Sequence, residues 1–125
     1  MDKILVVFLG GGLGSALRFL CSTAVQRASA GAFPTGTLTV NLIGCFVIGI
    51  LWAVSGRVNL PFLLSAFLFA GILGGFTTFS SFSIETIALL HNGAWRTALL
   101  YVALSNVLGL SLAAFGYYLV TLHRI

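Results

Sequence analysis

The sequence contains very few charged residues. Six lysine and arginine residues and two acidic residues occur among 125, whereas a soluble domain carries about 25% charged residues. A chain of this composition cannot cover a large water-exposed surface, so we do not expect a soluble globular domain. It also lacks the basic patch that nucleic-acid binding requires, so we expect no nucleic-acid partner.

Cysteine and proline are equally scarce, with two of each. Cys21 and Cys45 both fall in apolar stretches and form no C-x-x-C pair, which favours buried free thiols over a metal or redox site. The G-x-x-x-x-G-K-[ST] pattern of nucleotide-binding loops is also absent. The sequence therefore gives no sign of ATP-driven transport. We expect a protein that is not an enzyme.

Apolar residues are abundant instead, at 59% of the chain. About 20 consecutive apolar residues suffice for a helix to cross a bilayer. The sequence predicts an all-α membrane protein with one transmembrane domain, residues 1–125. Its N-terminal run fits a cleaved signal peptide poorly, because glycines and Arg18 interrupt it, so we expect it to be retained. The expected spans are residues 3–26, 37–55, 61–91 and 95–122.

The third span contains the most unusual stretch, the ten residues from Gly74 to Ser83. Two glycines, two threonines and three serines occur here, inside a run without any charged side chain. Adjacent glycines release the backbone from helical geometry, and threonine is a good N-cap for a new helix. We expect a helix that stops near Gly74 and restarts near Thr77 or Thr78.

A helix break inside a membrane leaves peptide groups without partners. Lipid cannot satisfy them, so protein, water or an ion must do so. Carbonyls at the end of the first half suit a cation, and the N-terminus of the second half suits an anion. The alternative is a packing seam, in which small residues let two helices approach closely. Spacing alone does not separate these interpretations.

Other polar residues also lie within the spans. Arg18 should face protein or water, or extend to the membrane interface. Asn41 shares a helix face with Thr37 and should point into the protein, either toward an ion or in an interhelical hydrogen bond. Tyr101 and Ser105 lie on one stripe of the fourth span. Glu85, near a span end, favours a solvated mouth position.

The positive charges are nearly balanced between the two sides of the membrane. Four spans place both termini on one side, so the positive-inside rule gives almost no preferred orientation. Such a chain can insert both ways up, and two opposite copies can pair as an antiparallel, dual-topology homodimer. One side carries Lys3, Arg57 and Arg124, and the other carries Arg27 and Arg96, with Arg18 unassigned.

Four motifs, in order along most of the chain, resemble the Fluc/CrcB family of small fluoride channels. They run from Gly10 to Arg18, from Pro34 to Gly44, from Gly74 to Glu85, and from Asn106 to Gly109. Two departures occur: Ser81 stands where threonine is common, and Gly109 lacks a hydroxyl that some members carry. The resemblance implies antiparallel dimers with two separate pores.

The resemblance also implies a structural sodium ion on the dimer axis and passive fluoride export through the cell's inner (plasma) membrane. Backbone carbonyls of Gly74 and Thr77 in each chain would hold the sodium ion. Asn41 would donate to fluoride, and Phe79 and Phe82 would line each pore with electropositive ring edges. The polar track would consist of Ser80, Ser81, Thr37 and Tyr101, with Arg18, Gly75, Thr78, Ser105 and Glu85 in supporting positions.

Two other functions deserve comparison. A small dual-topology multidrug exporter needs an acidic residue deep in its first span, where this chain has only Arg18. A non-transporting membrane subunit would use the same small residues for helix packing alone. A flux measurement separates both alternatives from a fluoride channel.

Overall fold

The computed structural model describes residues 2–29 and 31–122, and over these residues the protein is entirely helical. Four spans are long and apolar enough to cross a membrane, which confirms the predicted all-α, four-span architecture and makes this a multi-pass membrane protein. The elements are α1 (Asp2–Ala28), α2 (Thr35–Ser55), α3 (Phe62–Ser65), η1 (Ala66–Leu73), α4 (Gly74–Phe76), α5 (Phe79–His91) and α6 (Trp95–Leu122).

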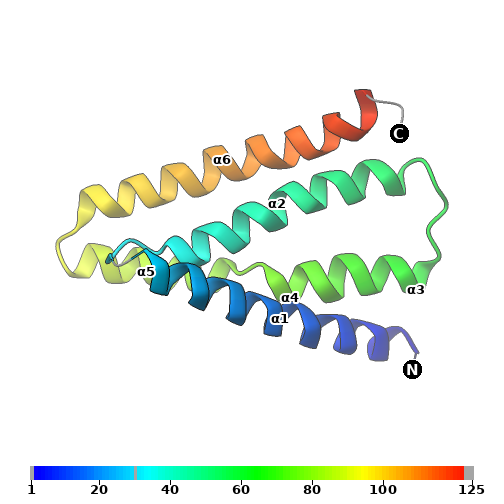
Figure 1. Ribbon diagram of the computed structural model, residues 1–125, viewed down its shortest axis with the longest axis horizontal. Helices are drawn as coiled ribbons and strands as arrows, with labels where there is room; N and C mark the ends of the chain where they lie inside the picture. Colours follow the sequence, from blue (N-terminus) through cyan, green and yellow to red (C-terminus); the bar gives the residue numbers. More distant parts are fainter. Residues whose placement is uncertain (1, 30, 123–125) are drawn as a thin grey trace.

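The helices form an elongated bundle with short connections at both ends (Figure 1). The N-terminal end of α1 and the C-terminal end of α6 lie at the same end of the bundle, as four spans require. The most extensive contacts join α2 to α6 and α1 to η1. Helix α2 also contacts α1, so it lies where all parts of the bundle meet.

The third span is the irregular one. Its middle is the π-helix η1, whose wider turns the sequence did not predict. The span is interrupted at Thr77 and Thr78, which have extended backbones with φ/ψ of −89°/157° and −149°/114°. The predicted restart at Thr78 is confirmed, because Thr78 is the N-cap of α5 and its side chain accepts a hydrogen bond from the Ser81 N–H.

The first half of the helix ends at Phe76, slightly beyond the predicted end near Gly74. Gly74 has helical dihedrals, φ −61° and ψ −36°, and the helix continues to Phe76. Glycine permits a break but does not impose one, and here close packing sets the role of Gly75. A Cβ on Gly75 would lie 2.5 Å from the carbonyl oxygen of Gly11 in α1. Gly75 therefore belongs to the packing seam that the sequence analysis left as an alternative.

The seam continues along α1 at Gly14. A Cβ on Gly14 would run into the carbonyl oxygen of Ile72 and would lie 2.9 Å from the nitrogen of Phe76. Gly12, on another face of the same helix, is exposed, and a Cβ there would meet nothing within 4 Å. The backbone of α1 thus rests directly on the segment that leads into the interruption.

We predict that Gly14→Ala destabilises the fold and Gly12→Ala does not. The Gly14 change should cost about 1–3 kcal/mol, because the added methyl group forces two backbones apart. The Gly12 change should be neutral or stabilising by up to about 1 kcal/mol, since alanine favours a helix. Unfolding monitored by circular dichroism in detergent measures both, and equal effects would contradict the seam.

Candidate functional site

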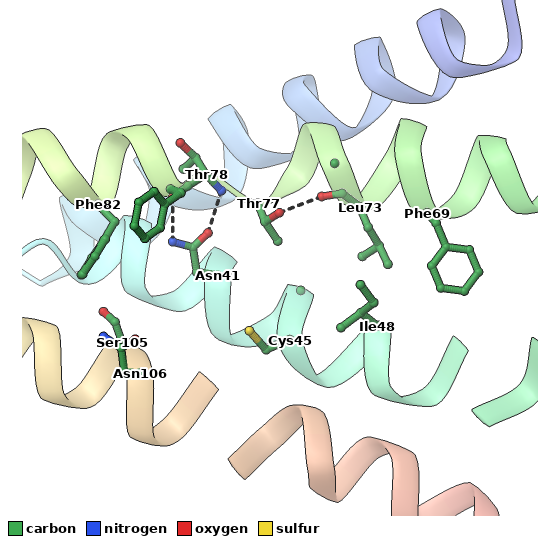
Figure 2. Close-up of a pocket in the computed structure, with 13 residues that line it drawn as sticks. Asn41, Cys45, Ile48, Phe69, Leu73, Thr77, Thr78, Phe82, Ser105 and Asn106 are labelled. Atoms are coloured by element: carbon green, nitrogen blue, oxygen red, sulfur yellow. Dashed lines mark hydrogen bonds between the residues drawn. The ribbon is translucent and has the colours of Figure 1, made fainter. Parts of the chain in front are cut away.

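The interruption in the third span is held by one side chain from α2. The Asn41 Nδ2 donates to the Thr78 carbonyl oxygen at 2.9 Å, and the Thr78 N–H donates to Asn41 Oδ1 at 2.7 Å (Figure 2). The Asn41 carboxamide therefore bonds both the N–H and the C=O of Thr78, as the backbone of a neighbouring β-strand would. The interhelical hydrogen bond considered for Asn41 is present, and it ties α2 to the break itself.

The end of the first half of the helix leaves carbonyl groups without their helical donors, among them those of Gly74 and Thr77. In a continuous helix the N–H groups of Thr78 and Ser81 would donate to the carbonyls of Gly74 and Thr77, four residues earlier. Here the Thr78 N–H is taken by Asn41, and the Ser81 N–H donates to Thr78 Oγ1 at 3.1 Å. Gly74 and Thr77 are the two residues whose carbonyls the resemblance assigns to sodium, so the backbone present fits that ion.

No group of three or more His, Cys, Asp or Glu residues that could hold a metal occurs within residues 2–29 and 31–122. Unwound backbone carbonyls are instead a recurring ligand set for alkali ions in broken membrane helices. Backbone carbonyls at the break would be the ligands of the sodium ion that the resemblance implies.

The start of α5 concentrates hydroxyl groups. The Thr78 hydroxyl donates to Ser81 Oγ at 3.0 Å, and Thr78 Oγ1 also lies within hydrogen-bond distance, 3.2 Å, of Ser80 Oγ. The partial positive charge of a helix N-terminus and these hydroxyls together suit an anion. Ser80 is exposed and Ser81 is half-buried.

A cavity of about 370 Å³, here called the break cavity, opens beside the interruption (Figure 2). The rings of Phe79 and Phe82 are neighbours on its wall, with centroids 5.5 Å apart, and Phe79 is 78% exposed. Elements α2, η1, α4, α5 and α6 all contribute to it. Its polar lining comes from Asn41, Cys45, Thr77, Thr78, Ser105 and Asn106.

Two further cavities lie between α1, α2 and α5. The arginine cavity, of about 230 Å³, is lined by Arg18 and by hydroxyl residues that include Thr78 and Ser81. The mouth cavity, of about 280 Å³, is lined by Gln26, Arg27 and Glu85 among others. Because Ser22 and Thr37 line both, the two cavities are neighbours, and they follow one another from the break toward one end of the bundle.

Arg18 and Glu85 can now be placed. Arg18 is half-buried and lines the arginine cavity, so it faces a polar space inside the protein. Glu85 is half-buried and lines the mouth cavity, and both of its carboxylate oxygens accept hydrogen bonds that the sequence did not predict. Thr37 Oγ1 donates to Glu85 Oε1 and the Tyr101 hydroxyl donates to Oε2, both at 2.7 Å.

Tyr101, another site residue named in the sequence analysis, connects to the features described above. Tyr101 is fully buried and reaches the site through Glu85 and through Phe82, whose ring lies 5.2 Å from its own. The sequence analysis placed Asn106 in the fourth motif, next to the stripe through Tyr101 and Ser105, but gave it no role in the site. It missed Gln26, which carried no such signal.

Comparisons with known proteins agree on one family. The family model described as CrcB-like protein, Camphor Resistance (CrcB), matches residues 5–117. A protein of Parabacteroides distasonis named Fluoride-specific ion channel FluC is 48% identical over 110 residues, covering 88% of this chain and 86% of its own. A protein of Thermus thermophilus with the same name is 48% identical over 117 residues, covering 94% of each chain.

We predict that Asn41→Ala lowers the free energy of unfolding by about 1–3 kcal/mol, because it leaves the Thr78 N–H and C=O without partners. Asn106→Ala is the matched control. Asn106 is exposed and donates only to the Val102 carbonyl of its own helix, at 2.8 Å, so its loss should change stability by less than about 0.5 kcal/mol. Denaturation of both variants in detergent tests this, and equal losses would remove Asn41 from the break.

Proposed function

The chain belongs to the CrcB-like family, and we propose that it is a fluoride-specific ion channel of the inner (plasma) membrane that lowers cytoplasmic fluoride by passive export. The observation that carries this proposal is the likeness, over 88% of this chain, to a protein named as such a channel. Hydrofluoric acid crosses membranes in its neutral form and releases fluoride inside. A passive channel lets the anion leave down its electrochemical gradient.

The break cavity supplies the donors that a dehydrated fluoride ion needs. An asparagine amide carries two hydrogens; one at Asn41 is given to the Thr78 carbonyl, and the other has no partner within the described residues. The Ser105 hydroxyl likewise has no partner there. The electropositive edges of Phe79 and Phe82 add weak, uncharged contacts. Donors without a full charge hold an anion weakly enough for conduction.

The arginine cavity and the mouth cavity supply a polar approach to the break. Arg18 and Arg27 line them, so the approach is electropositive, while the hydroxyls of Ser22, Thr37 and Ser81 offer successive donors. Charge near the path raises the local anion concentration without forming a tight site. The positive end of α5 lies at the inner limit of this path.

The active unit we propose is an antiparallel homodimer with two pores. The carbonyls of Gly74 and Thr77 lack their helical donors, and two chains meeting at their breaks would bring four such groups together. A structural sodium ion there would compensate the carbonyl dipoles. Balanced charge supports insertion in both orientations, with Lys3 and Arg57 toward one end of the bundle and Arg27 and Arg96 toward the other; Arg124, the remaining cation in that count, lies outside the described residues.

Purified protein in liposomes should release trapped fluoride, measured by a fluoride electrode, once a potassium ionophore dissipates the opposing potential. Chloride-loaded vesicles are the control and should release little, because a narrow pore lined by small donors favours the smaller anion. Vesicles that retain fluoride would favour a non-transporting membrane subunit. Release of chloride at the same rate would contradict a fluoride-specific channel.

The two phenylalanines of the break cavity should matter more than their neighbour. We expect Phe79→Ile and Phe82→Ile each to slow fluoride release about tenfold, corresponding to about 1.4 kcal/mol of lost ring-edge stabilisation. Phe76→Ile is the control, because Phe76 is half-buried and does not line that cavity. Initial efflux rates at equal protein density measure all three variants, and indistinguishable rates would contradict the ring assignment.

A further inference from the structure

The side chain of Gln26, near the end of α1, makes an unusual number of hydrogen bonds. Its Nε2 donates to the carbonyl oxygens of Gly31 at 3.2 Å and Phe33 at 3.1 Å. Its Oε1 accepts from Thr35 Oγ1 at 3.3 Å and from the Gly36 N–H at 3.1 Å. One carboxamide therefore binds both the α1–α2 connection and the first turn of α2.

The start of α2 depends on this contact because it has no cap of its own. The N-cap residue is Pro34, which makes no side-chain cap hydrogen bond. Gln26, which belongs to the neighbouring helix α1, supplies the missing cap by accepting a hydrogen bond from the Gly36 N–H. The backbones of α1 and α2 touch here, since a Cβ on Gly36 would run into the carbonyl oxygen of Ser22. The Gln26 side chain therefore has only a short distance to span.

Both segments that Gln26 holds lead to partners of Glu85. Phe33 packs edge-on against Tyr101, with ring centroids 5.6 Å apart and an interplanar angle of 78°. Thr37 follows Gly36 directly and donates to Glu85, as Tyr101 does. Gln26, Thr37 and Glu85 also line the same mouth cavity. The Gln26 carboxamide and the Glu85 carboxyl group thus belong to the wall of the same cavity.

We propose that Gln26 is a positioning residue of the channel. Its carboxamide fixes Phe33 and Thr37, and these hold Tyr101 and Glu85 in place in the wall of the mouth cavity. Gln26 acts through these residues and has no need to touch the anion. The proposal rests on the proposed fluoride conduction for its effect on flux, whereas the positioning itself is measurable without flux.

Two variants separate the hydrogen bonds that Gln26 donates from those that it accepts. Gln26→Met keeps the side-chain volume and removes all four hydrogen bonds, whereas Gln26→Glu keeps the acceptor for Thr35 and Gly36 and loses the donors to Gly31 and Phe33. Ser55→Ala is the control, because Ser55 donates only to the Trp52 carbonyl at the opposite end of α2, at 2.9 Å. Each protein is reconstituted in liposomes for fluoride efflux and in lipid nanodiscs for NMR.

We expect Gln26→Met to slow efflux about tenfold, the scale expected when lost neutral hydrogen bonds also misplace a site. The Tyr101 ring resonances should shift and the Gly36 amide should exchange faster with deuterium. Gln26→Glu should fall between Gln26→Met and the unchanged chain, and Ser55→Ala should match the unchanged chain.

Efflux within twofold of the unchanged protein would overturn the proposal, and so would slower efflux with unmoved Tyr101 resonances, which indicates general destabilisation. If the unchanged protein itself fails to release fluoride, the channel function fails. The Tyr101 and Gly36 signals then decide the positioning role on their own.

Discussion

A peptide group inside a bilayer has no water to bond, so an interrupted membrane helix must find other partners for its exposed N–H and C=O groups. This requirement organises the protein around Thr77 and Thr78. Asn41 takes both polar groups of the Thr78 peptide, and the Thr78 hydroxyl takes the Ser81 N–H. These bonds satisfy the N–H groups of Thr78 and Ser81 and leave the carbonyls of Gly74 and Thr77 without their helical donors. The proposed sodium and fluoride sites both rest on this asymmetry.

The rest of the bundle supports this arrangement. The glycines of α1 let its backbone pack directly on the segment before the break. Arg18 of α1 therefore lines a cavity together with residues at the start of α5. Helix α2 connects the two functional regions: Asn41 binds the break, and one turn earlier Thr37 binds Glu85. A change at Asn41 or at Thr37 should therefore also affect the other contact, because both side chains belong to one rigid helix.

Much of this architecture could be predicted from the sequence, because it follows from local rules. Apolar length gives four spans, and the capping chemistry of threonine gives the restart at Thr78. The helix end was misplaced because Gly74 and Gly75 tolerate a break without causing it, and the π-helix has no comparable sequence signal. The hydrogen bonds of Glu85 were not predicted because its partners, Thr37 and Tyr101, come from two other helices. Tertiary contacts of this kind are invisible to spacing within one span.

Solid-state NMR of the protein in lipid bilayers tests the central claim most directly. The Cα and Cβ shifts of Thr77 and Thr78 should be those of extended backbone, while Gly74 to Phe76 should be helical. The Thr78 amide should nevertheless resist exchange with deuterium, since it donates to Asn41 Oδ1. Helical shifts through Thr77 and Thr78, or rapid exchange of the Thr78 amide, would contradict the account.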